Sequence, residues 1–222
     1  MSTIVAVYTG QGLSGPLQAL FKEHLPDCRF VNIIDDSIIN DINREGRITQ
    51  SVKRRLFQYY QNAIDIGADI ILNTCSSVGE VADAARLLID TPLVKIDEPM
   101  ADIAVSKHKK IGVIATLPST LNPTIGLIKK RAELAGKDVE VVEGLAEGAY
   151  LALVNGKPEQ HDELILKTAY KLADTVDGIV LAQGSMARME KNLAEKTGKA
   201  VYSSPYYCVQ YIKKMLGEMK NG

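Results

Sequence analysis

The side chains best suited to acid–base chemistry lie in one segment, Asn73-Thr74-Cys75-Ser76-Ser77. An apolar run that leads into this segment (69–74) predicts a buried strand, and an apolar periodicity after it (78–89) predicts a helix. Backbone N–H groups at a helix start bind anions such as carboxylates and lower the pKa of a nearby thiol. Cys75 is therefore a candidate base or nucleophile, although a small buried cysteine beside a capping serine is the bland alternative. We expect the substrate to contact Asn73, Thr74, Ser76 and Ser77.

Hydroxyl groups also follow another predicted strand (110–116), in the string Thr116-Leu-Pro-Ser-Thr120. Hydrogen-bond donors of this kind stabilise the negative charge that develops when a proton leaves a carbon beside a carboxylate. The same string suits a simple helix-entry turn containing Pro118, and the sequence favours neither interpretation. Glu98 either contacts a substrate amino group or is a first-turn helix acid. The further predicted substrate-binding residues are Thr9, Gln11, Glu98, Thr116, Ser119 and Thr120.

A glycine-rich loop after the first predicted strand offers a rival hypothesis. The string from Gly10 to Gly15 is a GxGxxG, and Asp35 follows 20 residues after Gly15. Those are elements of a dinucleotide-binding fingerprint, which would indicate a nicotinamide- or flavin-dependent oxidoreductase. Pro16 directly after the third glycine and the richer polar cluster around Cys75 count against this hypothesis. The acidic stretch 35–49 is expected to be a solvated loop, with a lid as the alternative.

Short β-branched runs alternate with longer amphipathic stretches along the whole chain. Strands are predicted at 3–9, 29–34, 69–74, 93–96, 110–116, 139–142, 178–183 and 200–203. Helices are predicted at 50–66, 78–89, 124–135, 162–175 and 205–218. Near-continuous apolar strands are typical of parallel sheets covered by helices on both faces. The alternation predicts the α/β class.

An internal repeat predicts two similar halves. The segment Asp69–Cys75 aligns without gaps on Asp177–Gln183, and the strand ending at Thr9 aligns on the strand ending at Thr116. Their separations are nearly equal, 66 residues in the first half and 67 in the second. We therefore expect one lobe at 1–97, joined by the C-terminal helix (205–220), and another at 98–204. Ligands of open α/β sheets bind at the carboxyl ends of the strands, so the active site is expected in the cleft between the lobes.

Composition narrows the class of protein. The net charge is −1 and basic residues never exceed a run of three, so nucleic acid is not an expected partner. No apolar stretch reaches membrane-spanning length, and no membrane partner is expected. Three cysteines without a CxxC pair suit the reducing cytoplasm. The three histidines lack metal-binding spacing, and no metal site is predicted.

Six strings together resemble the Asp/Glu/hydantoin racemase superfamily, over nearly the whole chain. They are Val7-Tyr8-Thr9, Asn-Ile-Ile-Asp-Asp-Ser (32–37), Asn-Thr-Cys-Ser-Ser (73–77), Ile-Asp-Glu-Pro-Met (96–100), Gly-Val-Ile-Ala-Thr (112–116) and Leu-Ala-Gln-Gly-Ser-Met (181–186). The resemblance implies two flavodoxin-like parallel-sheet lobes related by a pseudo-twofold axis, with a small carboxylate-bearing substrate between them. It implies cofactor-independent chemistry, commonly in a homodimer, with one cysteine on each face of the substrate α-carbon. Cys75 is similar in position to the first-lobe cysteine.

The second lobe departs from this pattern, because the internal alignment places Gln183 where the partner cysteine is expected. Neither Gln183 nor Ser185 carries protons as a thiol does. We predict catalytic roles for Cys75, Gln183 and Ser185, and substrate contacts for Gly184 and Met186. The predicted enzyme is an isomerase that transfers protons through cysteine beside the carboxylate of an Asp- or Glu-like amino acid or related acid. A one-thiol lyase, decarboxylase or isomerase acting on a dicarboxylic acid is the alternative.

Overall fold

The computed structural model describes residues 1–221, which divide into two compact units. One unit is Met1–Ile96 with the segment from Pro205 onward, and the other is Asp97–Ser204. Each unit contains a four-stranded sheet in which all strands are parallel, so the predicted α/β class is confirmed. Within the described residues, no helix is both long enough and apolar enough to cross a bilayer.

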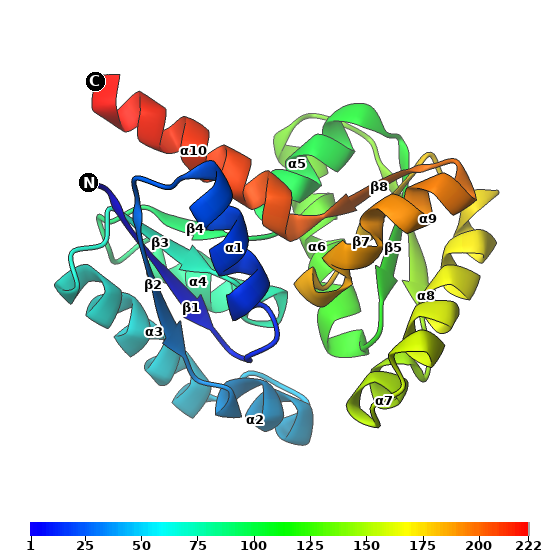
Figure 1. Cartoon of the computed structure of the whole chain (residues 1–222), viewed down its shortest axis with the longest axis horizontal. Coiled ribbons are helices and arrows are strands. Elements are labelled where there is room, and N and C mark those ends of the chain that lie inside the picture. The colour runs from blue at the N-terminus through cyan, green and yellow to red at the C-terminus, as the bar shows by residue number, and fades with distance from the viewer. Residues whose placement is uncertain (222) are drawn as a thin grey trace. The chain divides into compact units, whose positions relative to one another are not determined.

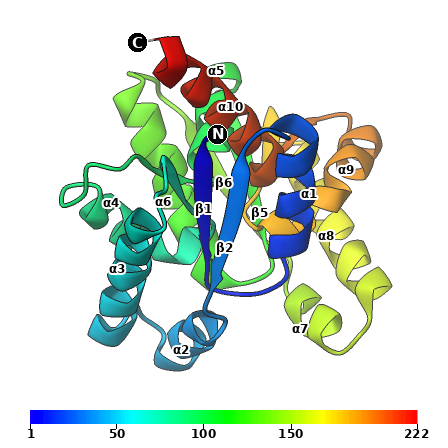
Figure 2. The same ribbon diagram turned by 60° about the vertical axis from the view of Figure 1, so that its left-hand side comes forward.

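In the first unit the strand order is β2-β1-β3-β4. The strands are β1 (Thr3–Tyr8), β2 (Arg29–Ile34), β3 (Ile70–Asn73) and β4 (Leu93–Lys95). The helices are α1 (Ser14–His24), α2 (Ser37–Glu45), α3 (Gln50–Asp65), the 3-10 helix η1 (Ser76–Val78), α4 (Gly79–Ala85) and α10 (Ser204–Asn221). Helices α3 and α1 lie on opposite sides of β1 and β2, as Figures 1 and 2 both show.

Two buried clusters cover the two faces of this sheet. Alternate strand residues such as Val5 and Ile71 pack against Leu56 and Tyr60 of α3. The intervening strand residues pack against α1 and α10. Because side chains alternate between faces along a strand, both faces must be apolar when helices cover both.

In the second unit the strand order is β6-β5-β7-β8. In both sheets the second strand along the chain lies at one edge, next to the first, and the third and fourth follow, so the two sheets have the same topology. The strands are β5 (Lys110–Ala115), β6 (Glu140–Leu145), β7 (Gly178–Leu181) and β8 (Ala200–Ser203). The helices are α5 (Glu98–Lys107), α6 (Pro118–Leu134), α7 (Ala149–Val154), α8 (Pro158–Ala173), the 3-10 helix η2 (Gly184–Met189) and α9 (Glu190–Thr197). One buried cluster joins the sheet to α8, η2 and α9.

The two units share details as well as strand order. At the start of the paired strands, Thr3 N donates to Asp69 Oδ2 at 2.7 Å, and Lys110 N donates to Asp177 Oδ2 at 2.9 Å. The strand registers also correspond, with Ile71 beside Leu93 in one sheet and Ile179 beside Val201 in the other. These equivalent contacts, each within its own unit, support the internal duplication.

Three predicted elements need correction. The stretch 35–49 is mostly helix α2, an amphipathic helix that buries Ile38 and Ile42, and not a solvated loop. The helix expected at 78–89 ends at Ala85. The helix expected from 124 begins at Pro118, because proline is tolerated in the first turn, where its missing N–H has no helical partner anyway.

Candidate active site

Cys75 lies directly beyond the carboxyl end of β3. Its backbone is extended (φ −126°, ψ 118°) and it precedes η1, whose first hydrogen bond runs from Val78 N to the Cys75 carbonyl oxygen at 3.3 Å. The side chain is half-buried, packs against the α3-side core, and forms no disulfide. A thiol at a strand end and partly open to solvent can reach a ligand, which a core cysteine cannot.

A short polar network holds the Cys75 loop in place. Tyr60 donates its hydroxyl to Asn73 Oδ1 at 3.1 Å, and Asn73 Nδ2 donates to the Cys75 carbonyl oxygen at 3.0 Å. Burial raises the pKa of Tyr60, and the nearby Cys75 raises it further, so the phenol stays protonated and remains a donor. Asn73 therefore links Tyr60 to the backbone of Cys75, with its amide oxygen as acceptor and its amide nitrogen as donor.

The other predicted residues near Cys75 differ in burial and in hydrogen bonding. The Thr74 hydroxyl donates to the carbonyl oxygen of Val7 at 3.0 Å and so joins β3 to β1. Ser77 is buried and Ser76 is half-buried. Thr9 is buried, and its hydroxyl makes no hydrogen bond within the described chain. The N-cap residues of η1 and α4, Cys75 and Val78, make no side-chain capping bond. Helix α4 is too short to contribute a full helix dipole.

Gln183 occupies the position in the second unit that Cys75 occupies in the first. Its backbone is also extended (φ −127°, ψ 130°), and it precedes η2 with a hydrogen bond from Met186 N to its carbonyl oxygen at 3.0 Å. Its Oε1 accepts from Thr116 N at 2.7 Å and from the Thr116 hydroxyl at 2.9 Å. With that oxygen engaged, and with no described partner for Nε2, Gln183 offers amide N–H donors.

The residues around Gln183 differ in accessibility. Ser185 is exposed and Gly184 is half-buried. The Met186 side chain is fully buried in the core against α8 and α9, where it packs the unit and does not face solvent. The turn into η2 thus carries an exposed hydroxyl, on Ser185, and a buried core side chain, on Met186.

The segment after β5 is a helix entry. Thr120 donates both its backbone N–H and its hydroxyl to the carbonyl oxygen of Leu117, at 3.2 and 2.9 Å. Ser119 is half-buried in the first turn of α6, and Glu98 is the first residue of α5. Of this hydroxyl-rich set, Thr116 donates its hydroxyl to Gln183.

The glycine-rich loop lacks the contacts of a dinucleotide fingerprint. None of its glycines has a positive φ, and a Cβ on Gly15 would meet nothing within 4 Å, so close helix–strand packing does not require that glycine. Gln11 is exposed and donates to Asp36. Both oxygens of Asp35, which would have to bind a ribose, already accept hydrogen bonds, from Ser37 on one side and from Arg55 and Tyr59 on the other. The geometry therefore argues against the oxidoreductase hypothesis.

Residues 16–212 match the family model described as Asp/Glu/Hydantoin racemase. The chain belongs to this family. Racemases are isomerases, so the predicted enzyme class is confirmed. No curated protein sequence matches the chain.

Several solved racemases share the fold. Glutamate racemase isoform RacE1 from Bacillus anthracis superposes with a TM-score of 0.77 and 16% identity, covering 98% of this chain and 82% of that one. Allantoin racemase from Klebsiella pneumoniae gives a TM-score of 0.74 at 16% identity, with 98% and 88% covered. Picrophilus torridus aspartate racemase gives 0.74 at 14% identity, with 98% and 95% covered. At such low identity these likenesses establish the two-lobed racemase fold.

Two polar pairs of this racemase-family chain were missed in the sequence. Lys95, buried at the end of β4, forms an ion pair with Asp83 of α4 at 3.0 Å. Glu190, the first residue of α9, accepts hydrogen bonds from Ser203 at the end of β8. The internal repeat relates Lys95 to Ser203 once the strands are aligned, but it does not relate Asp83 to Glu190.

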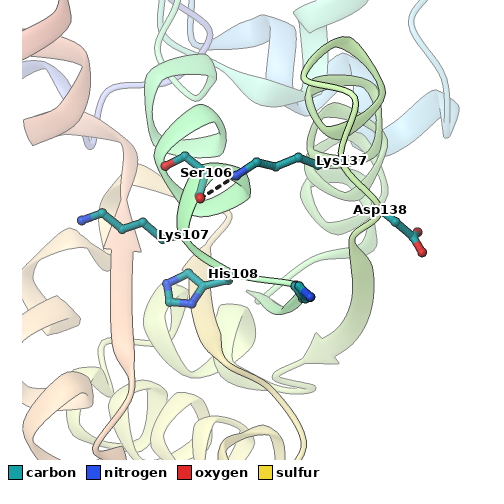
Figure 3. A pocket seen from close by; sticks show the side chains of 6 residues that line it. Ser106, Lys107, His108, Lys137 and Asp138 are labelled. Carbon is teal, nitrogen blue, oxygen red and sulfur yellow. Dashed lines mark hydrogen bonds between the residues drawn. The ribbon is translucent and has the colours of Figure 1, made fainter.

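One pocket of the racemase fold lies away from the strand ends. It has a volume of about 470 Å³ and is lined by Ser106, Lys107, His108, Lys109, Lys137 and Asp138, next to the amino-terminal end of β5. Lys137 donates to the Ser106 carbonyl oxygen at 2.6 Å, while Lys107 and Asp138 point away from it to opposite sides (Figure 3). The lining side chains diverge, so this pocket is not the carboxylate site.

Proposed function

We propose that the chain is a cofactor-independent isomerase that moves a proton at a carbon next to a carboxylate, with Cys75 as the proton carrier. The substrate class is a small amino acid resembling aspartate or glutamate, or a related acid. The thiolate of Cys75 removes the α-proton, and a second proton donor returns a proton to the opposite face. We also propose a reducing compartment such as the cytoplasm, because the reaction requires a reduced thiol.

The observation that carries this proposal is the setting of Cys75 within the racemase-family fold. The thiol stands at the carboxyl end of a central strand, half-buried and outside any disulfide, on a loop fixed by Asn73. Ligands of parallel sheets bind at this edge. A fixed and partly desolvated thiol is suited to proton transfer, because its geometry is set before the substrate arrives.

Stabilising the intermediate is the harder part of the reaction. Loss of the α-proton places negative charge on the carboxylate, and preorganised donors must meet it. We assign this role in the first unit to Thr9 and to Ser76 with its backbone N–H, and in the second to the Gln183 amide and the Ser185 hydroxyl.

A one-thiol lyase or decarboxylase is the second candidate, and one observation favours it. Gln183 stands at the position equivalent to Cys75, and an amide does not titrate. An enzyme that generates a carbanion by losing carbon dioxide needs a proton donor on one face only. Cys75 would then protonate the carbanion, and Gln183 would bind the carboxylate that remains.

Deuterium exchange in heavy water separates the candidates. The panel consists of the D and L forms of aspartate and glutamate, with methylmalonate and phenylmalonate as decarboxylation substrates. We expect α-deuterium incorporation into both enantiomers of one amino acid and interconversion between them. Cys75→Ser should abolish the reaction, whereas Cys28→Ser, the same change on the α1-side core, should retain it. Carbon dioxide release from a malonate without amino acid exchange would identify the lyase instead, and an active Cys75→Ser enzyme would refute both.

A further inference from the structure

A buried lysine of the first unit lies on the same face of its sheet as Cys75. Leu93 of β4 belongs to the buried cluster on the α3 side of the sheet, and the Cys75 side chain packs against that cluster. Lys95 follows Leu93 by two residues, so its side chain leaves the strand on the same face. The strand register also places Lys95 directly beside Asn73, whose amide holds the Cys75 carbonyl oxygen. Lys95 is therefore next to the residue that fixes the position of the Cys75 loop.

The ammonium group of Lys95 reaches the turn that follows Cys75. Only 6% of its side chain is exposed, and Nζ lies 3.0 Å from Asp83 Oδ1 of α4. A Cβ added to Gly79 would lie 3.5 Å from Nζ, so the ammonium lies against Gly79. The Gly79 N–H donates to the Ser76 carbonyl oxygen and closes η1, which Cys75 directly precedes. Four residues of a 3-10 helix span about 8 Å, a distance over which a buried charge still acts.

Arg86 brings a second positive charge to the acid that holds Lys95. It directly follows α4, and its Nη1 lies 3.5 Å from Asp83 Oδ1. Burial raises the pKa of Tyr60, the nearby Cys75 raises it further, and the charge of Arg86 lowers it. Cys75 and Arg86 therefore act on the same phenol, and the positive charges at Asp83 lie within electrostatic reach of the thiol.

Other charged side chains of α3 and α4 are neutralised in pairs of their own. Lys53 of α3 contacts Glu80 of α4 at 3.0 Å, and both side chains are well exposed. Arg55 of α3 is paired with Asp35 at 3.0 Å. Water and salt screen exposed pairs strongly and buried charges much less. Lys95, the buried cation, is thus the charge expected to dominate at the turn before α4.

We infer that Lys95, held by Asp83, is a positioning residue that stabilises the thiolate of Cys75 within the first unit. This inference rests on the proposed function, in which that thiolate removes the α-proton. The thiol loses its proton to water, Lys95 stays protonated throughout, and its positive charge lowers the free energy of the anion that remains. The role requires no contact between Lys95 and the substrate.

The deciding experiment measures the alkylation of Cys75 by iodoacetamide across pH 5–9, because the thiolate is the reactive form. Mass spectrometry of the Cys75 peptide follows the reaction in the full chain, without any substrate. We expect Lys95→Met to slow alkylation at pH 7 by about threefold to tenfold. Asp83→Asn, which removes the acid and keeps both cations, should accelerate it. A purely structural role predicts the same direction for both variants, since each breaks the same ion pair.

Matched controls separate charge from folding. Cys28, half-buried on the α1 side of the sheet, is the internal control, and its alkylation should be the same in all variants. Lys95→Arg keeps the positive charge and should retain most of the reactivity of Cys75. Lys53→Met removes an exposed lysine that pairs with another acid of α4, and it should behave as wild type. In the exchange reaction, the loss in Lys95→Met should be greatest at low pH and should close as the pH rises, because high pH deprotonates the thiol without help.

Two results would overturn the inference. One is a change in the same direction in Lys95→Met and Asp83→Asn, and the other is alkylation in Lys95→Met within about twofold of wild type at every pH. If Lys95→Met does not fold, Asp83→Asn decides alone, and a rate no higher than that of wild type overturns the inference. A wild-type enzyme that exchanges no α-proton, with alkylation rates that change as expected, would refute the proposed function and support the effect of Lys95. The two failures are therefore distinct.

Discussion

The two units share one scaffold but place different chemistry at the same positions. Cys75 and Gln183 have nearly the same backbone conformation, and each directly precedes the 3-10 helix that follows the third strand of its unit. Lys95 at the end of β4 corresponds to Ser203 at the end of β8, and each contacts an acid of the preceding helix, Asp83 of α4 and Glu190 of α9. Backbone geometry has been retained across the duplication while the ionisable side chains have changed. In this fold, position is set by strand register, and chemistry is set by a few side chains at the strand ends.

The largest test of this comparison contrasts the two strand-end residues. Cys75→Ala should lower the exchange rate by about 10³-fold, because no other thiol lies in that loop. Gln183→Ala should lower it by about tenfold to 100-fold, the effect of losing a hydrogen-bond donor to the developing charge. Both rates are measured by deuterium incorporation in proteins whose circular dichroism matches wild type. Equal losses in the two variants would contradict the proposed asymmetry.

A second test compares the polar pairs through stability. Lys95→Met should lower the free energy of unfolding by about 2 kcal/mol, less than for a fully buried pair because Asp83 is partly exposed. Ser203→Ala should cost about 1 kcal/mol, the loss of one hydrogen bond to a carboxylate. Urea unfolding provides the measurement. The double variant Asp83→Asn, Lys95→Met should recover part of the loss, and if it recovers none, Lys95 stabilises the fold by packing and not by charge.

The sequence predicted the fold well because its strongest signals are local. Apolar runs and their spacing predicted all eight strands, and the aligned strings around Cys75 and Gln183 predicted the repeat. The strand-end segment that carries Cys75 followed from the same pattern. These predictions depend on residues adjacent in the chain, where burial and secondary structure are directly coupled.

The missed features depend on contacts between distant residues. Helix α2 was taken for a loop because its sequence is mostly polar, and Arg55 of α3 stabilises its start through Asp35, Ser37 and Asp41. Glu190 was not singled out in the sequence, because only the folded contact between α9 and β8 places Ser203 beside it. The packing of the folded unit makes Met186 a core residue. The spacing of residues along the chain does not show this.

Asp69 and Asp177 accept hydrogen bonds at the start of the paired strands, and they offer a third, smaller test in which the units should behave alike. Asp69→Ala leaves the backbone N–H of the buried Thr3 without its acceptor, and Asp177→Ala leaves those of the half-buried Lys110 and the exposed Lys109 without theirs. Each should lower the free energy of unfolding by about 1 kcal/mol. The loss at Asp177 should be no greater than the loss at Asp69, because water can replace an acceptor at exposed N–H groups. Hydrogen exchange at Thr3 and Lys110 amides should speed up in the matching variant only, and a response at both amides would indicate that the units do not unfold separately.

The smallest expected effects concern acid pH and two arginine-bound carboxylates, Asp35 in the first unit and Asp162 in the second. Burial raises the pKa of Asp35, but hydrogen bonds from Ser37 and Tyr59 and the charge of Arg55 outweigh it and hold the pKa below its ordinary value. Asp162 follows the same pattern, with Arg188 and His161 as partners. A lowered folded-state pKa stabilises the protein above the unfolded pKa, and that stability is lost as the pH falls through the folded pKa.

Arg55→Met and Arg188→Met should therefore each reduce stability by about 1 kcal/mol or less at pH 7, since both pairs are partly solvated. The difference from wild type should close as the pH falls below the carboxylate pKa, because the protonated acid no longer favours arginine. Glu190 has the opposite sign: its raised pKa gives stability that is present below the unfolded pKa and lost as the pH rises through the folded pKa. Thermal unfolding across pH 3–8 should thus show Glu190→Gln gaining on wild type with rising pH while the two arginine variants fall behind it. A parallel pH response in all three variants would mean that Glu190 is no less neutralised than Asp35 and Asp162, and the contrast between the units would not extend to their charges.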